Sequence, residues 1–204
     1  MLGIRGWIYD QFLIGLTSRW YAEVIELLPD GARLLDVGIG TGSALLVNAD
    51  QIKAKELHIT GIDIDRDYIE RAHKRIKGSS LNGRVEVMLE SIYNHHSGPY
   101  DAIYFSASFM ILPDPEGALR HCQDLLKSGG KIYFTQTIQN AVSPVLDKIK
   151  PILGRLTTIE FGRVTYADEF RSQIQAASLQ LETFRTIASH GPRSYCLAVA
   201  RPVA

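Results

Sequence analysis

The chain has 204 residues, of which 46% are hydrophobic and 22% charged, with 22 basic side chains balancing 22 acidic ones. This length and apolar content suit one domain with a sizeable core, so we expect residues 1–204 to form a single domain. A net charge of zero supplies no long-range attraction to phosphate backbones, and nucleic acid is therefore not the expected partner.

The first 29 residues carry apolar side chains at roughly helical spacing, which predicts one or two amphipathic helices that cap the domain or simply pack on it. Residues 7–16 form an apolar stretch that is interrupted by Asp10 and Gln11 and is too short to span a bilayer. No cleavable signal peptide is evident, and we expect a cytoplasmic protein. The spaced residues are Tyr9, Phe12, Leu13, Leu16, Trp20, Val24, Ile25 and Leu28.

An apolar run then breaks into alternate glycines, Gly38, Gly40 and Gly42. This pattern predicts a buried strand that turns sharply into a helix, with no Cβ atoms to keep a ligand off the backbone. A second apolar run, residues 59–63, ends in Asp63, whose carboxylate can accept both hydroxyl hydrogens of a ribose. The two pieces predict the two halves of one nucleoside-binding site.

A helix is expected next, with Asp65 as its cap, Gly78 as its stop, and Ile69, Ala72 and Ile76 on its buried face. Its basic residues suit the negative end of the helix dipole, and we interpret them as a solvated helix end. Three further strands are predicted by apolar runs that follow polar or turn residues. The basic residues of the helix are Lys74, Arg75 and Lys77. The three further strands cover residues 84–89, 100–106 and 131–134.

Turn signals organise the last part of the chain. Either Gly129 or Gly130 can take the positive φ that ends a helix before the fifth strand. Residues 165–168 have the form of a capping box at the start of another helix. Residues 180–188 and 195–201 predict two strands joined by a short turn, which makes them antiparallel. The alternation of helices and strands elsewhere predicts an α/β fold whose mostly parallel sheet is covered on both faces.

The segment Asp36–Gly42, an acidic residue followed by G-x-G-x-G, resembles the first motif of class I S-adenosylmethionine-dependent methyltransferases of the small-molecule type. A dinucleotide fingerprint would instead place its third glycine three positions after the second. The resemblance runs from about Leu34 to Arg201. It implies S-adenosylmethionine as cofactor and a doubly wound, Rossmann-like sheet of seven strands, mostly parallel, with an antiparallel last strand beside the fifth.

The resemblance also assigns parts of the cofactor to residues. The glycine loop lies against the methionine end, and Asp63 holds the ribose. Ser91 stands where many family members place an aspartate for the adenine amino group, and Ile92 can add a backbone N–H and an apolar contact. The full expected cofactor set is Asp36, Gly38, Ile39, Gly40, Gly42, Asp63, Ile64, Ser91, Ile92 and Ser106.

The residues that select the acceptor are expected to lie outside these cofactor-binding segments. The pair Tyr9-Asp10 resembles one that helps close the site in several small-molecule methyltransferases, and residues 138–164 are long enough for a substrate lid. Phe109 and Met110 would line an apolar acceptor pocket, or else pack in the core. The fourth strand is not followed by Asn-Pro-Pro-Tyr, which argues against adenine-N6 and glutamine methyltransferases. Tyr9-Asp10 together with Ser18-Arg19-Trp20 loosely resembles the pattern of quinone C-methyltransferases and phospholipid N-methyltransferases, which implies a small or lipid-like acceptor.

Methyl transfer from a sulfonium is an in-line displacement, which needs alignment and exclusion of water more than it needs a base. No motif assigns a catalytic role to any of the candidate bases. The two cysteines lack metal-ligand spacing and are expected to be buried thiols, with no metal site. The candidate bases are Tyr9, His95, His96, His121 and His190, and the cysteines are Cys122 and Cys196.

Two other functions stay open. The serine at position 91 and the unassigned base suggest a methyltransferase-like protein that binds the cofactor or a partner without catalysis. An NAD-dependent oxidoreductase could use Asp63 on its ribose, but the glycine spacing argues against it.

Overall fold

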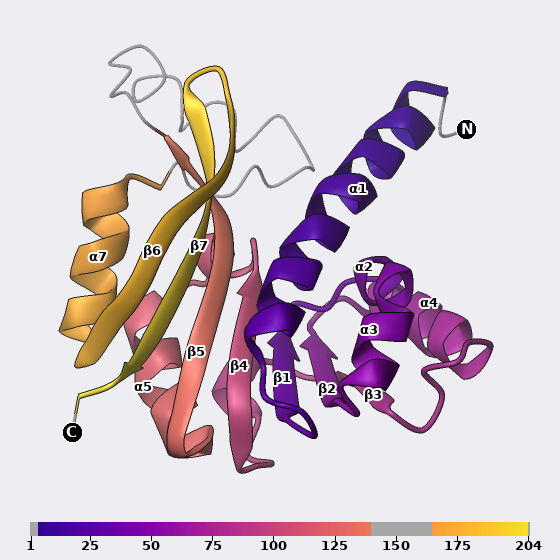
Figure 1. Ribbon diagram of the computed structural model, residues 1–204, viewed down its shortest axis with the longest axis horizontal. Coiled ribbons are helices and arrows are strands. Elements are labelled where there is room, and N and C mark those ends of the chain that lie inside the picture. Colours follow the sequence, from indigo (N-terminus) through magenta and orange to yellow (C-terminus); the bar gives the residue numbers. More distant parts are fainter. Residues whose placement is uncertain (1–3, 140–164, 204) are drawn as a thin grey trace.

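A computed structural model describes residues 4–139 and 165–203, with side chains described from Gly15 onward. It contains a seven-stranded sheet with helices on both faces (Figure 1). The part of the expected lid between residues 140 and 164 lies outside the described residues. The strands are β1 (Arg33–Val37), β2 (His58–Asp63), β3 (Val85–Leu89), β4 (Tyr100–Ser106), β5 (Leu126–Gln139), β6 (Leu179–His190) and β7 (Arg193–Pro202).

The sheet order is β3-β2-β1-β4-β5-β7-β6, which confirms the expected fold class. The first five strands are parallel, and β7 runs antiparallel to both β5 and β6. From β1 the chain winds outward to β2 and β3 and then returns to β4 on the other side of β1. Ligands of such sheets bind beyond the carboxyl ends of the strands at this reversal, so the fold predicts a site above β1 and β4.

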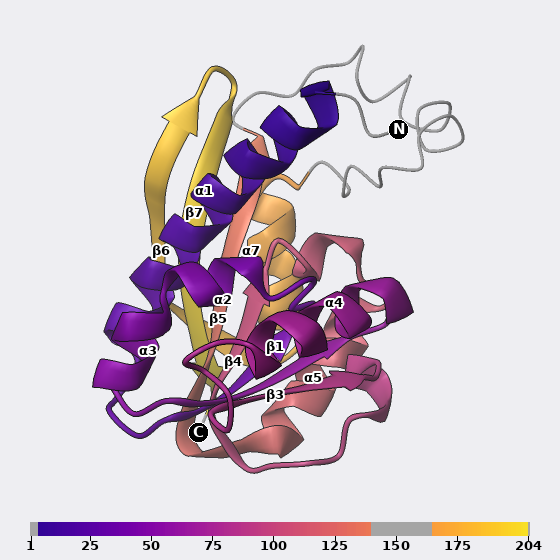
Figure 2. The ribbon, with the colours of Figure 1, turned by 90° about the vertical axis from the view of Figure 1, so that its right-hand side faces the viewer.

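The sheet separates the core into two layers, and helices cover each of its faces (Figures 1 and 2). On one face lie α1 (Ile4–Leu27), α2 (Ser43–Val47), α3 (Ala49–Ala54) and α4 (Arg66–Lys77), and on the other lie α5 (Pro115–Leu125), α7 (Ala167–Ala176) and the 3-10 turns η1 (Ile92–Asn94) and η2 (Phe109–Ile111).

The N-terminal segment is one helix of 24 residues rather than two. Its second half packs on the sheet, with Trp20, Val24 and Ile25 buried. Its first half extends past the carboxyl ends of the strands, on the side of the expected site (Figure 1). Tyr9 and Asp10 lie in that half, where side chains are outside the described part.

The local predictions for α4 are confirmed, and the one for Gly129 is wrong. Asp65 caps α4 by accepting from the Tyr68 backbone N–H at 3.1 Å, and Gly78 follows its last turn. Gly129 has φ +78° but lies inside β5, because α5 already ends at Leu125. At the other predicted helix start, α7 begins at Ala167 with Tyr166 as its N-cap, and Thr165 pairs with Ile138 in a parallel bridge.

Cys122 and Cys196 are buried free thiols, as expected. Among the described residues, no helix has the length and apolar character that a membrane span requires.

Candidate functional site

The glycine loop and Asp63 meet at the carboxyl edge of the sheet. The backbone N–H groups of Gly38 and Ile39 donate to the Ile62 carbonyl at 2.8 and 3.1 Å, which extends the β1–β2 ladder into the loop. The Gly40 N–H then donates to Asp63 Oδ2 at 2.9 Å, and Asp63 Oδ1 accepts from the Asp65 N–H at 2.9 Å. The structure therefore joins the two predicted halves of the site directly.

The first two glycines of the loop serve different needs. Gly38 has φ +82°, and a Cβ there would lie only 2.6 Å from the Cβ of Ser108, so the protein itself requires glycine. Gly40 has φ +59°, yet a Cβ there would meet nothing within 4 Å. Open space beside the backbone of Gly40 is the cradle that a ligand approaching the loop would fill. Ser108 escaped the sequence analysis because nothing local links it to Gly38.

Two other members of the predicted cofactor set face into the protein. Ile39 is buried, and its side chain occupies the place where a Cβ on Gly61 would lie, 2.2 Å from Ile39 Cδ1. Gly42 has φ +68° and packs toward Ile76 on α4. These positions can offer a ligand only their backbone groups.

Asp36 lies fully buried under α1. Its Oδ2 accepts from the Tyr21 hydroxyl at 2.7 Å, while Oδ1 has no hydrogen-bond partner. Burial raises the pKa of Asp36 to about 7, the Tyr21 hydrogen bond opposes this shift, and the charge of Asp63 adds to it. Burial and the nearby Asp36 raise the pKa of Tyr21 well above its usual value. Tyr21 was missed in the sequence, although it precedes the buried pair Val24 and Ile25 by about one turn.

Ser106 ends β4, the strand next to β1, and its Oγ is also buried. The hydroxyls of Tyr21 and Tyr104 lie near enough to interact with this Oγ, but neither forms a hydrogen bond of good geometry with it. Asp36 Oδ1 and Ser106 Oγ are thus two oxygens that can accept hydrogen bonds at the carboxyl ends of neighbouring strands. Leaving such groups unpaired is costly, so a ligand that supplies N–H or O–H donors there would be favoured. The ammonium group of a sulfonium amino acid is such a donor, and the residues present fit that group.

The expected adenine positions lie beside Asp63. The Glu90 N–H donates to the Asp63 carbonyl at 3.0 Å, which places Ser91 next to the end of β2. Ser91 is the N-cap of η1, where its Oγ accepts from the Tyr93 N–H at 3.4 Å, and Ile92 is buried. Ile64, directly after Asp63, is 77% exposed and presents an apolar surface at the edge of the site.

Phe109 is part of the core. It is 2% exposed, and its ring contacts Phe105, Phe134 and Phe170 with centroids 5.1 to 5.8 Å apart. The alternative that Phe109 packs in the core is therefore the right one, and the expectation that its ring lines the acceptor pocket is wrong. Met110 is only partly buried and remains a candidate acceptor contact.

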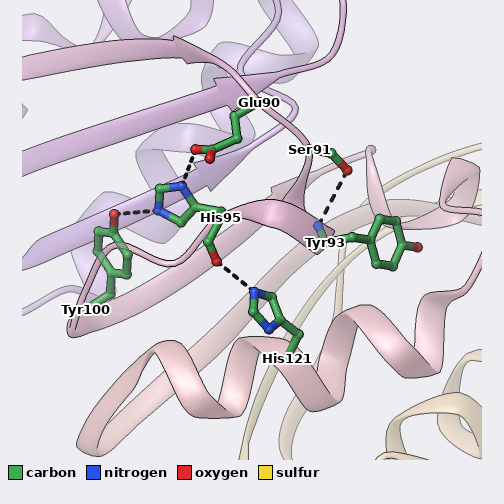
Figure 3. A network of polar contacts seen from close by, with 6 residues as sticks. All are labelled: Glu90, Ser91, Tyr93, His95, Tyr100 and His121. Carbon is green, nitrogen blue, oxygen red and sulfur yellow. Dashed lines mark hydrogen bonds and ion pairs between the residues drawn. The ribbon is translucent and has the colours of Figure 1, made fainter.

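None of the candidate histidine bases contacts the glycine loop through a described interaction. His95 is buried between Glu90 and Tyr100, and His121 Nε2 donates to the His95 carbonyl (Figure 3). His96 lies against the His121 ring. His190 ends β6 and is exposed. These positions provide no base at the cofactor loop.

The interpretation of the basic end of α4 as merely solvated is wrong for Arg75. Its Nη1 donates to Thr41 Oγ1 at 2.8 Å and also to Ser43 Oγ, so this guanidinium holds the glycine loop rather than being merely solvated. The contact spans 34 residues in sequence, and the helix pattern around Arg75 gives no sign of it.

Within residues 4–139 and 165–203, no group of three or more histidine, cysteine, aspartate or glutamate residues could hold a metal ion.

Residues 35–132 match a family model described as a methyltransferase domain.

Curated relatives agree with this match. One is the ubiquinone biosynthesis O-methyltransferase of Chromobacterium violaceum, 28% identical over 159 residues, which cover 75% of this chain and 66% of the relative. Another is the aklanonic acid methyltransferase DauC of Streptomyces sp. strain C5, 34% identical over 136 residues, which cover 65% of this chain and 61% of the relative. The chain thus spans less than two thirds of the length of these proteins.

Among solved structures, that of the [4+2]-cyclase SpnF is similar with a TM-score of 0.74 and 20% identity, covering 92% of this chain and 82% of that one. At this identity the likeness concerns the fold alone. Together with the glycine loop, Asp63 and the sheet order, these matches support the predicted relation of the chain to the class I S-adenosylmethionine-dependent methyltransferases.

Proposed function

We propose that this protein transfers a methyl group from S-adenosylmethionine to a small or lipid-like acceptor by in-line displacement. The observation that carries the proposal is the hydrogen bond of 2.9 Å from the Gly40 N–H to Asp63 Oδ2. It brings the loop expected at the methionine end next to the carboxylate expected at the ribose, at the edge of the sheet where such ligands bind.

The chain's own residues divide the work of binding. Asp63 has lone pairs left on both carboxylate oxygens for the two ribose hydroxyls. Asp36 Oδ1 and Ser106 Oγ accept from the ammonium group. The open side of Gly40 leaves room for the part of the cofactor that joins the ribose to the ammonium group. Ile64 offers its exposed apolar side chain to the nucleobase. Ser91 and Ile92 complete the nucleobase side.

When bound, the cofactor supplies an electrophilic methyl group on a sulfonium. The protein then has to orient the acceptor and exclude water. Tyr9, Met110 and residues 138–164 are proposed to do this. The half of α1 that contains Tyr9 extends past the carboxyl ends of the strands, Met110 follows β4, and residues 138–164 continue from the end of β5 in the sequence. The relatives are named for ubiquinone biosynthesis and for aklanonic acid, which supports a small, partly apolar acceptor. A cytoplasmic location belongs to the same proposal.

The test is a calorimetric titration of the protein with S-adenosylmethionine, S-adenosylhomocysteine, NAD and NADP in parallel. We expect saturable binding of the two sulfur nucleosides only. Asp63→Asn should weaken it about tenfold or more, because polar groups on the ribose lose their partner. Asp67→Asn, an exposed carboxylate four residues later, is the matched control and should leave the affinity unchanged. Binding of a nicotinamide nucleotide alone would overturn the proposal.

A second candidate is a protein that binds the cofactor without transferring its methyl group. Two observations favour it: a cyclase shares the fold, and no histidine is placed at the glycine loop among the described contacts. Transfer of a radiolabelled methyl group to a panel of quinols, phenols and fatty acids separates the two functions. Tight binding with no labelled product from any acceptor would favour this second one.

A further inference from the structure

The connection between β3 and β4 carries the expected nucleobase residues but contains no α-helix. Residues 90–99 form only the single 3-10 turn η1, from Ile92 to Asn94. The segment starts beside the ribose carboxylate, because the Glu90 N–H donates to the Asp63 carbonyl at 3.0 Å. Beyond this bond and the backbone bonds of η1, side-chain contacts contribute to where Ser91 and Ile92 lie.

His95 provides the central contact, as Figure 3 shows. Its side chain is fully buried, with Nδ1 2.6 Å from Glu90 Oε2 and Nε2 2.8 Å from the Tyr100 hydroxyl. An ionised Glu90 can only accept, so Nδ1 carries a hydrogen, and in the neutral imidazole Nε2 then accepts from Tyr100. Every polar atom of the buried ring is thereby paired, and the carboxylate bond is of the strong, charge-assisted kind.

Two further contacts join the same segment to α5 and its N-cap. His121 on α5 reaches the His95 carbonyl with its Nε2 at 2.7 Å. The Tyr93 hydroxyl donates to the Asp114 carbonyl at 2.9 Å and accepts from the Asp114 N–H at 3.0 Å, at the start of α5. Glu90 is the one member of this network that is adjacent in sequence to Ser91.

We propose that His95 is a positioning residue for recognition of the nucleobase: by holding the Glu90 side chain inward, it fixes Ser91 and Ile92 in the orientation that distinguishes adenine from other purines. The inference rests on the proposed function. Loss of the bond would free the Glu90 carboxylate to turn toward solvent, where it is already 27% exposed, and would loosen the backbone at Ser91.

The experiment separates the two sides of the imidazole. His95→Asn keeps an amide nitrogen near the position of Nδ1, facing Glu90, while His95→Gln keeps one near Nε2, facing Tyr100. Tyr100→Phe removes only the second contact and serves as the matched control. The readout is the ratio of the dissociation constants for S-adenosylhomocysteine and S-inosylhomocysteine, in which the adenine amino group is replaced by oxygen. A general loss of stability cancels in this ratio.

We expect His95→Gln to weaken S-adenosylhomocysteine binding about tenfold and to reduce the discrimination between the two ligands by a similar factor, the size of one lost hydrogen bond to a charged group. His95→Asn and Tyr100→Phe should keep the wild-type ratio even where they lower the melting temperature. Glu90→Ala removes the same bond from the other side and should reproduce the loss. It also serves as the test if His95→Gln does not fold.

Two results overturn the inference in distinguishable ways. Wild-type discrimination in both His95→Gln and Glu90→Ala would show that the bond does not position the segment, while cofactor binding stands. Failure of the wild-type protein to bind S-adenosylhomocysteine would remove the proposed function and this inference with it. Nitrogen-15 NMR of the wild-type protein checks the premise independently, since it should show His95 protonated at Nδ1. Protonation at Nε2 alone would contradict the arrangement.

Discussion

Asp36 keeps a carboxyl group in a place where its charged form is disfavoured, and this has a measurable consequence. Its pKa of about 7 in the folded protein lies above the value of about 3.9 expected in an unfolded chain. The folded state therefore binds the proton more tightly, and stability falls as the pH rises from about 4 to 7, by at most about 1.4 kcal/mol per pH unit. Asp36→Asn should flatten this decline, because an amide does not titrate and its oxygen can still accept from Tyr21.

Urea unfolding at intervals between pH 4 and 8 measures the effect. Asp124→Asn, which removes an exposed carboxylate on α5, is the control and should leave the slope over this range as in the wild type. An Asp36→Asn protein with the full wild-type pH dependence would mean that Asp36 does not titrate in this window.

At the scale of elements, a single lysine fastens the end of α1. Lys55 follows α3, and its Nζ donates to the carbonyls of Ile25 at 3.1 Å and Glu26 at 2.9 Å and also to that of Leu28. The last carbonyls of a helix have no partner within it, and a cation there also suits the helix dipole. Lys55→Met keeps the aliphatic stem but removes the donor, and should cost about 1–2 kcal/mol of unfolding free energy.

Lys53→Met is the control for this variant. Lys53 pairs with Asp50 on the surface of α3, and such exposed pairs contribute little. Equal urea midpoints for the two variants would show that the contacts of Lys55 with α1 are not stabilising.

The helix α7 is held on the sheet by an aromatic cluster. Phe170 is fully buried, with its ring centroid 5.3 Å from Phe134 on β5, 5.8 Å from Phe109 and 5.8 Å from Phe184 on β6. Phe170→Ala should lower the free energy of unfolding by about 3–5 kcal/mol, since it removes a buried ring and leaves a cavity. Gln175→Ala, an exposed change on the same helix, should have little effect. A small loss for Phe170→Ala in urea unfolding would mean that the cluster collapses around the missing ring.

At the scale of the whole molecule, contacts close in sequence were predictable and distant ones were not. The strands, the glycine turn and the Asp65 cap follow from periodicity and from chemistry within a few residues. The bond from Tyr21 to Asp36, the hold of Arg75 on the loop and the contact of Ser108 with Gly38 depend on how the layers pack, and no local pattern encodes them. Gly129 was misjudged because a glycine with positive φ serves a strand irregularity as readily as a helix end.

The two halves of α1 lead to the last prediction. From Ser18 onward the helix is attached to the rest of the fold: Asn48 Nδ2 donates to the Ser18 carbonyl at 2.9 Å, the Trp20 ring lies 5.7 Å from Tyr195, and Glu23 pairs with Arg185. The first half extends beyond the strand ends (Figure 1). We therefore expect deletion of residues 1–14 to leave the fold intact and deletion of residues 1–28 to unfold the protein.

Circular dichroism, calorimetry with S-adenosylhomocysteine and methyl-transfer rates distinguish the roles of the two halves. In the shorter deletion, cofactor affinity should stay within about twofold of the wild type, because the described hydrogen bonds of the glycine loop and Asp63 are made by residues outside the deleted segment. Turnover of the acceptor should fall, since the segment proposed to cover it is gone and water can enter. Unfolding of this variant would assign the first half to the core, and undiminished turnover would remove it from the acceptor site.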